Sequence, residues 1–533
     1  MSTTSPQSQP TQKQQEETQP MLRRSYKDAI GLLNSLQSNF ATIQAVRQSG
    51  KTRNEMLIPE MVEWTRRIGY EPSDFNKLNV IHVTGTKGKG STCAFVQSIL
   101  SQYRTPPVGV ASSRSNSASN LSSAGSGPAS GLESAAKITK IGLYTSPHLK
   151  SVRERVMING KPISEELFAK YFFEVWDRLT ASNSDTNVFP NMGEGVKPAY
   201  FRYVTLLSFH AFMKEGVDTA IYEVGVGGEY DSTNIMQKPT ACGITTLGID
   251  HTVMLGNTLE EIAWNKSGIF KEGAQCFSVE QPEEAMKVIE ERALEKKASR
   301  FTIVRNRSEV NELKLGLNGE FQYQNASMAV ALCEAHLSKL GFEIDHDNLS
   351  TEFVAGLEQA KWPGRCQILP DPKKQDELTW FIDGAHTKES IANGSKWFTT
   401  ATNREHKRVL LFNQQTRDIQ PLIAELYKKI EAADLKFDHV IFTTNVTWAS
   451  GNYSADLVSL NTSEAQVSSL EVQTKMAGYW NELDKKSRKH IFHDIETSVN
   501  FVRTLEGPLD VFVCGSLHLV GGFLVVLDGK QTV

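Results

Sequence analysis

The chain repeatedly alternates short apolar runs, each ending in a glycine or polar turn, with stretches of helical character. The N-terminal runs are NVIHVTG (79–85), KIGLYTS (140–146), TAIYEVG (219–225) and ACGITTLG (241–248). Segments 91–103 and 201–216 between them have the length and composition of helices. Buried strands that alternate with helices predict a mostly parallel α/β sheet covered on both faces, with ligands bound beyond the carboxyl ends of the strands.

A second series of such runs follows the segment WPGR (362–365). It consists of TWFIDGA (379–385), RVLLFN (408–413), HVIFTTN (439–445) and LDVFVCGS (509–516). With 533 residues, the chain is long enough for more than one domain. We therefore expect a P-loop-type, mostly parallel sheet domain over 21–362 and a smaller Rossmann-like α/β domain over 363–533. The cleft between two such domains is a favoured place for ligands.

Three segments need a separate interpretation. Residues 1–20 hold six glutamines and three prolines and are expected to form a disordered tail. Ten of the 27 residues in 111–137 are serine, which predicts a flexible insertion in the first domain. The stretch from Met21 is amphipathic with a basic start, and we expect a surface helix that opens the fold. The alternative is a shorter product that begins at Met21 and carries a mitochondrial address.

Composition argues against several classes of protein. The formal net charge is −4 and there is no long basic block, so neither nucleic acid nor an anionic membrane is expected as the main partner. No apolar run approaches the ~18 residues of a membrane span, and the N-terminus lacks the apolar core of a secretory signal. The cysteines are scattered without a CxxC pair, which favours a reducing compartment: Cys93, Cys242, Cys276, Cys333, Cys366 and Cys514.

The strongest single motif is VTGTKGKGST (83–92), in which a strand, a glycine-rich turn and a helix start follow one another. Gly85, Gly88 and Gly90 allow the backbone N–H groups to approach phosphate oxygens. The helix N-terminus adds a partial positive charge, and Lys89 adds a full one. The spacing departs from GxxxxGK[ST], since a glycine separates Lys89 from Ser91. The compact form GTxGKG[ST] is typical of Mur-type and folate ligases and predicts a nucleotide-phosphate site.

Three further polar residues follow predicted strands: Ser146, Glu223 and His251. A parallel sheet would bring them to one edge, where a hydroxyl, a carboxylate and an imidazole around ATP are plausible ligands of Mg²⁺. Taken singly, each has an ordinary structural explanation, and histidine is an unusual ligand for magnesium. Lys266, in IAWNKSGIF (262–270), is expected from the residues alone to be solvent-exposed on a short helix.

In chain order these motifs resemble those of folylpolyglutamate synthases. The resemblance is carried by GTKGKGST, YTSPHL with VRERVMINGKPIS (152–164), EVGVGGEYDSTN, GIDHTVMLG, IAWNKSGIF, WPGR, DGAHT (383–387) and GSLHLVGG (515–522). It runs from about residue 26 to residue 527, and the YDSTN and DGAHT variants are similar to eukaryotic members. The resemblance implies ATP-dependent addition of L-glutamate to the terminal γ-carboxylate of tetrahydrofolates and folylpolyglutamates, for folate retention and one-carbon metabolism. It also implies Mg²⁺, a monovalent cation such as K⁺, a monomer, and a cytoplasmic or also mitochondrial location.

The same resemblance implies a role for each matching residue. The ATP phosphates would lie against Gly85, Thr86, Lys87, Gly88, Lys89, Gly90 and Ser91. Ser146 and Glu223 would bind one Mg²⁺, and His251 would help to bind a second. Asn325 would contact adenine, beside Phe321, where many bacterial relatives have histidine. From the second domain, Arg365 and Asp383 would reach ATP, and His386 and Ser516 would serve the incoming glutamate. Lys266 would be carbamylated, and the expected catalytic set is Lys89, Lys266, His386 and Ser516.

Three alternatives stay open. The first is a dihydrofolate synthase or bifunctional folate ligase, which shares the chemistry but accepts dihydropteroate. The second is a Mur cell-wall ligase, against which the absence of an extra N-terminal UDP-sugar domain argues. The third is a catalytically inactive, nucleotide-binding P-loop homologue. A guanine-reading NKxD segment is absent, and Ser146, Glu223, His251 and Lys266 are all present, so we expect an active ligase.

Overall fold

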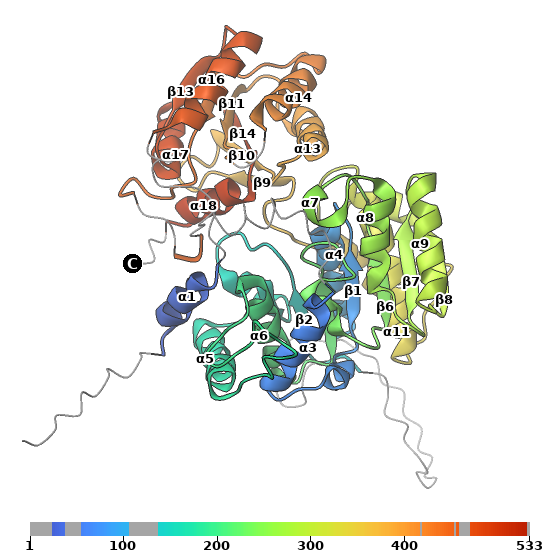
Figure 1. Ribbon diagram of the computed structural model, residues 1–533. Coiled ribbons are helices and arrows are strands. Elements are labelled where there is room, and N and C mark those ends of the chain that lie inside the picture. Colours follow the sequence, from blue (N-terminus) through green and yellow to red (C-terminus); the bar gives the residue numbers. More distant parts are fainter. Residues whose placement is uncertain are drawn as a thin grey trace, which may run out of the picture.

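The computed structural model describes residues 24–37, 55–105, 137–415, 418–451, 455–457 and 469–529. The expected disordered tail (1–20), Met21 and the insertion 111–137 up to residue 136 lie outside these ranges. The described chain forms two α/β domains, one coloured blue to yellow and the other orange to red (Figure 1). The expected α/β fold class, with two mostly parallel sheets, is therefore confirmed.

The N-terminal domain is built on a sheet of eight strands in the order β4-β3-β2-β5-β1-β6-β7-β8. All neighbours from β2 to β8 are parallel, whereas β3 and β4 add an antiparallel ribbon. The strands are β1 (Ile81–Thr84), β2 (Ile141–Tyr144), β3 (Val156–Ile158), β4 (Lys161–Pro162), β5 (Thr219–Glu223), β6 (Ala241–Ile244), β7 (Gln275–Val279) and β8 (Arg300–Val304).

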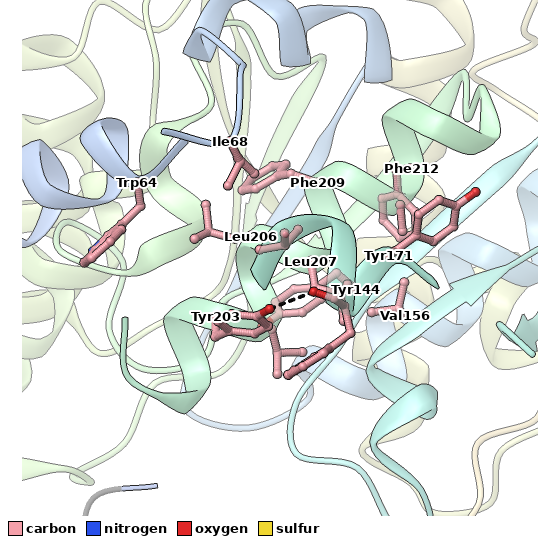
Figure 2. Packing of buried hydrophobic residues seen from close by; sticks show 14 of the residues in the cluster. Trp64, Ile68, Tyr144, Val156, Tyr171, Tyr203, Leu206, Leu207, Phe209 and Phe212 are labelled. Atoms are coloured by element: carbon pink, nitrogen blue, oxygen red, sulfur yellow. Dashed lines mark hydrogen bonds between the residues drawn. The ribbon is translucent and has the colours of Figure 1, made fainter. Parts of the chain in front are cut away.

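Helices cover both faces of this sheet. One face carries α3 (Leu57–Arg67), α5 (Glu165–Ala181), α6 (Tyr200–Glu215), α8 (Leu259–Lys266) and α9 (Glu283–Glu295), and α1 (Tyr26–Ser35) packs on α5. Figure 2 shows part of the core beneath α3 and α6, where Tyr203 and Phe209 of α6 belong to one buried cluster with Tyr144 of β2. The other face carries α4 (Lys89–Gln102), α11 (Gln322–Lys339) and α12 (Thr351–Gln359). Short helices complete the domain: η1 (Pro72–Leu78), η2 (Val152–Arg155), η3 (Ser232–Ile235), α7 (Thr252–Leu255), η4 (Ser267–Ile269) and α10 (Ser308–Asn311).

The C-terminal domain has a six-stranded sheet in the order β13-β12-β11-β14-β10-β9, in which only β9 is antiparallel. Its strands are β9 (Gln367–Pro370), β10 (Leu378–Ile382), β11 (Lys407–Phe412), β12 (His439–Phe442), β13 (Arg488–Ile491) and β14 (Leu509–Cys514). Helices α13 (Lys388–Ala401), α14 (Ile419–Ala432) and α16 (Glu471–Leu483) cover one face. Helices α17 (Ile495–Thr504) and α18 (Leu517–Asp528) cover the other, next to η5 (Ala455–Leu457).

The order of the N-terminal strands sets the position of the predicted site. The adjacent strands β2, β5, β1 and β6 are parallel, so the turns that follow them lie along one edge of the sheet. The phosphate loop, Ser146 and Glu223 follow β1, β2 and β5 in this arrangement. Helix α18 and the loops after β10 and β14 face this region from the second domain (Figure 1).

Candidate active site between the two domains

The glycine-rich turn after β1 leads directly into α4. Gly88 is the residue before the helix and has a φ of +88°, in the left-handed region where glycine carries no steric penalty. A Cβ atom at Gly88 would also overlap the side-chain amide of Asn325. The backbone N–H groups of Thr86 and Lys87 donate to the Thr246 carbonyl, at 3.0 and 3.1 Å. The N–H groups of the first turn of α4, which lack intrahelical partners, are therefore the ones that face an anion.

Two lysines converge on one carbonyl of this loop. Lys89 Nζ donates to the Gly85 oxygen at 3.1 Å, and Lys266 Nζ donates to the same oxygen at 2.8 Å. Lys266 is only 4% exposed, so the expectation of a solvent-exposed lysine is wrong. Burial, and then the Lys89 charge, hold the pKa of the Lys266 amine well below its usual value. The packing of α8 against the loop after β5 explains the burial, because Asn265 Oδ1 accepts from the Gly228 N–H at 2.9 Å.

The strand-end carboxylate of Glu223 is held by the turn that follows β2. It is 4% exposed and accepts hydrogen bonds from the Thr145 hydroxyl and, at 3.1 Å, from the Ser146 N–H. Ser146 and Glu223 thus lie together, as the sequence predicts. Thr145 was not expected, although its place between β2 and Ser146 in the motif would have suggested it.

His251 is an exposed residue in the left-handed region, with a φ of +51°, immediately before α7. Within the described ranges, no three His, Cys, Asp or Glu side chains form a group able to hold a metal ion. A divalent cation at Glu223 would therefore depend on ATP oxygens and water for most of its ligands. The buried carboxylate oxygens of Glu223 suit such a hard cation.

A chain of amides connects the expected adenine contact with the phosphate loop. Asn325, on α11, is buried, and its Nδ2 donates to Gln322 Oε1 at 2.9 Å. Gln322 Nε2 in turn donates to the hydroxyl of Ser91 at 3.3 Å. Gln322, which was not expected from the sequence, lies one helical turn before Asn325 and positions it. Phe321 is 36% exposed and lines a cavity of about 640 Å³ between α11 and α13.

In the second domain, Asp383 is buried and stabilises the loops around it by hydrogen bonds. Its buried carboxylate accepts from the backbone N–H groups of Cys366 and Ala385, both at 2.9 Å. Burial raises the pKa of Asp383, and the charge of Arg365 opposes this shift. The Gly384 N–H donates to the Gly364 carbonyl at 2.9 Å. Asp383 thus fixes the turn that carries Arg365.

His386 and Ser516 lie in the adjacent turns that follow β10 and β14. His386 Nδ1 is 2.8 Å from the Gly384 carbonyl, so this nitrogen carries the proton in a neutral ring. Ser516 is the residue before α18, and its hydroxyl accepts from the His518 N–H at 3.1 Å. The Gly515 N–H donates to the Ala385 carbonyl at 2.9 Å and joins the two turns.

A cavity of about 900 Å³ between the domains brings part of the predicted site together. Its lining includes Gly90 of the phosphate loop, Ser146, Glu223 and, from the second domain, Arg365. Trp362, which the sequence reasoning left out, also lines it, and its indole packs on Gly90. The other expected residues lie outside this lining: Gly85, Thr86, Lys87, Gly88, Lys89, Ser91, His251, Lys266, Asn325, Asp383, His386 and Ser516. The arrangement places an anion-binding helix end beside a buried carboxylate and a guanidinium from the second domain.

Ion pairs join the domains on the other side of the phosphate loop. Lys87 Nζ lies 2.7 Å from Glu389 Oε2 of α13, and Lys396 of α13 pairs with Glu320. Thr86 faces its own domain, where its hydroxyl donates to the Gly248 carbonyl at 3.1 Å. The phosphate loop therefore contacts both domains.

Comparison with known proteins gives consistent relatives. Residues 365–526 match the family model described as dihydrofolate synthetase, C-terminal domain. The chain is 50% identical over 518 residues to a protein of Saccharomyces cerevisiae strain FostersO named folylpolyglutamate synthase, covering 95% of this chain and 88% of the yeast protein. The yeast protein of the same name from strain AWRI796 matches equally well.

Solved structures share the fold. A Mycobacterium tuberculosis folylpolyglutamate synthase complexed with ADP is 20% identical, with a TM-score of 0.63 and coverage of 95% of this chain and 99% of that one. E. coli FolC in complex with DHPP and ADP is 21% identical, with a TM-score of 0.62 and coverage of 96% and 100%.

Proposed function

The chain belongs to the folylpolyglutamate synthase family, and we infer from this membership that it is an ATP-dependent ligase that adds L-glutamate to folates. The yeast relatives carry that name at half identity over nearly the whole chain. The observation in the structure that supports it best is the cavity in which Gly90, Glu223 and Arg365 converge. A phosphate-binding helix end, a carboxylate and a second-domain cation are the groups that carboxylate activation by ATP requires.

The acceptor carboxylate must be activated, because its direct reaction with an amine would have to expel oxide, which is a very poor leaving group. The terminal γ-carboxylate of the folate attacks the γ-phosphorus of ATP, which forms an acyl phosphate and releases ADP. The amino group of glutamate then attacks the acyl carbon, loses a proton and expels phosphate. Both steps concentrate negative charge, which Lys89, the first turn of α4 and Arg365 stabilise. Because Arg365 comes from the second domain, closure of the cleft both completes the site and excludes water.

Ser146, Glu223 and His251 would hold Mg²⁺, which would neutralise charge on the ATP phosphates. A further part of the proposal is that Lys266 is carbamylated. An amine attacks CO₂ only when it is neutral, and burial lowers the pKa of Lys266 in that direction. The ammonium first loses one proton; attack of the neutral amine on CO₂ then forms one N–C bond, breaks one C=O π bond and releases a second proton, so a cation is replaced by a carbamate anion. Mass spectrometry of the intact protein at high bicarbonate should show the added CO₂, and its absence in a fully active enzyme would remove this role.

The remaining roles follow from the family. Asn325 would contact adenine, Arg365 and Asp383 would reach ATP from the second domain, and His386 and Ser516 would serve the incoming glutamate. A monovalent cation, K⁺, would be required, and replacing it with tetramethylammonium should then lower turnover. We expect a monomer in the cytoplasm, and a mitochondrial form that begins at Met21 is the alternative; sedimentation and fractionation test these points. No helix within the described ranges is long and apolar enough to cross a membrane.

The decisive assay measures glutamate-dependent ADP release with tetrahydrofolate and with dihydropteroate as acceptors. Release with tetrahydrofolate alone is the expected result. Dihydropteroate stays a second candidate acceptor because the C-terminal segment matches a model described as dihydrofolate synthetase. Release only with dihydropteroate would overturn the proposed acceptor, and no release with either would overturn the ligase activity.

A further inference from the structure

Five acids and five basic residues line the 900 Å³ cavity, but they differ in how many of them have partners within the protein. The acids are Glu154, Glu165, Glu223, Asp456 and Asp528. Each of these acids already accepts a hydrogen bond from the protein or lies beside one of its cations. Asp456 accepts from the Val152 N–H at 2.9 Å, and Glu154 accepts from the Leu149 N–H at 2.8 Å. Glu165 lies 3.6 Å from Arg153 Nη2, and Glu223 is held by the turn described above. Asp528 pairs with Lys150 at 2.7 Å.

Of the five basic residues, Lys150 and Arg153 pair with the lining acids Asp528 and Glu165, whereas two lysines have no such partner within the described ranges. Lys27 and Lys361 are exposed, and neither has a hydrogen bond or ion pair with any residue that the structure describes. Arg153 holds the Ile163 carbonyl at 3.0 Å, but its Nε is buried without a hydrogen-bond partner in the described part of the chain. Two lysines without partners among the described residues, in a cavity whose acids all have donors or cations from the protein, favour an anionic ligand.

Lys27 and Lys361 lie at separated places along the lining. Lys361 precedes Trp362, whose indole packs on Gly90, so it lies at the phosphate-loop end. Lys27 is on α1, where Tyr26 carries the Arg153 guanidinium 5.5 Å from its ring centroid. Figure 1 shows α1 well apart from α4. At about 900 Å³ the cavity is near the upper end of the ~300–1,000 Å³ range of small-molecule sites, so it has room beyond the reacting group.

We propose that Lys361, and Lys27 with Arg153, form two carboxylate subsites for the glutamate tail of the acceptor. This rests on the proposed function. The reacting γ-carboxylate must lie at the phosphate loop, so the α-carboxylate of the same terminal glutamate meets Lys361 in every acceptor. Each earlier glutamate adds one α-carboxylate further along the cavity, towards α1. Lys27 and Arg153 therefore meet only acceptors that already carry several glutamates, and they favour continued extension.

The test compares tetrahydrofolate monoglutamate and triglutamate. In Lys361→Gln, the acceptor KM should rise about two- to fivefold for both, the usual size of one solvent-exposed ion pair. In Lys27→Gln, it should rise by that factor for the triglutamate only, and Lys27→Arg should restore it. Lys77→Gln is the matched control, because Lys77 is exposed on η1 and does not line the cavity.

A salt series separates charge from local structure. Between about 0.05 and 0.3 M salt, the wild-type KM should rise more for the triglutamate than for the monoglutamate, since exposed charges are screened over this range. Lys27→Gln should lose this difference. Equal effects of Lys27→Gln on both acceptors, or none on either, would overturn the proposal.

A binding measurement tests the two carboxylate subsites independently of the ligase activity. Calorimetric titration of each acceptor into the enzyme with ADP needs no turnover. A tail-length difference that Lys27→Gln removes supports the subsites even if ligation itself fails. Equal affinities of wild type and Lys27→Gln for the triglutamate would overturn the subsites while the ligase activity stands.

Discussion

At the scale of single residues, Lys89 carries the clearest consequence for catalysis. Its ammonium reaches the Gly85 carbonyl at the start of the phosphate loop, beside the N-terminus of α4. Lys89→Ala should lower kcat by about 10²–10³-fold, as expected when one group that stabilises transition-state charge is removed. Steady-state ADP release measures the loss. Circular dichroism should be unchanged, and near-normal turnover would contradict the assignment.

A buried histidine gives the N-terminal domain a predictable pH dependence. His336 on α11 is fully buried between the hydroxyls of Thr219 (3.2 Å) and Thr240 (2.7 Å), and burial lowers its pKa to about 3. Between pH 6.5 and pH 3 the unfolded chain binds a proton that the folded chain excludes. Stability should therefore fall as the pH falls through this window, by about 2 kcal/mol from pH 6.5 to pH 5.

Chemical denaturation of wild type and His336→Gln at several pH values measures this contribution. The variant should lose less stability than wild type as the pH falls from 6.5 to 5. His346→Gln is the control, because His346 is exposed at the end of the same region. Parallel pH profiles for wild type and His336→Gln would show that His336 does not exclude the proton.

Lys266 shows why residue environments were harder to predict than motifs. A lysine on a short helix gives no sign of burial, because burial depends on how α8 packs on the phosphate loop. Ser146 and Glu223 were placed correctly because both end adjacent parallel strands, and that follows from the pattern alone. Gln322 and Thr145 were missed because each acts on a neighbour by a hydrogen bond that only the tertiary structure reveals.

At the scale of elements, α1 connects the two domains. Arg24 pairs with Asp177 of α5 at 2.6 Å, and the Tyr26 hydroxyl donates to Asp456 at 2.6 Å. The amphipathic pattern of this segment predicts only a surface helix. Tyr26→Phe removes this hydrogen bond to a charged acceptor, which should weaken the docking of α1 by about 1.5–3 kcal/mol.

Hydrogen exchange of residues 26–35 measures this change, and faster exchange in Tyr26→Phe is expected. Tyr427→Phe is the matched control, since its hydroxyl contacts Glu431 within α14. Unaltered exchange in α1 would mean that the contact with Asp456 does not hold the helix.

Strand prediction succeeded in the sheet centres and failed at the edges. Every strand expected from an apolar run is present, namely β1, β2, β5, β6, β10, β11, β12 and β14. The strands that were not expected are β3, β4, β7, β8, β9 and β13. Most of these lie at sheet edges, where exposed residues break the apolar run: β8 (RFTIV) and β13 (RKHI) are largely exposed or half-buried. β7 is buried, and its run QCFSV could have been predicted as a strand from the sequence.

At the scale of the whole molecule, contacts between the two domains hold the cleft in its closed arrangement. Lys87–Glu389 and Lys396–Glu320 bridge the domains on one side, and Tyr26–Asp456 bridges them on the other. The acyl phosphate is at risk from water until the cleft closes. The ion pairs are solvent-exposed, so they bias closure without locking it.

Reversing the charge of both acidic partners tests whether these ion pairs favour closure of the cleft. In Glu389→Lys/Glu320→Lys, lysines would face Lys87 and Lys396, and each repulsion is worth about 1 kcal/mol near 4 Å in water. The domains should then spend more time apart, which raises the KM for ATP about tenfold and increases the radius of gyration in small-angle scattering. The matched control is Glu471→Lys/Glu425→Lys, because those acids pair with Lys475 and Lys429 inside single helices. If the double reversal leaves both measurements unchanged, closure is driven by the substrates and by the contacts around Asp456 instead.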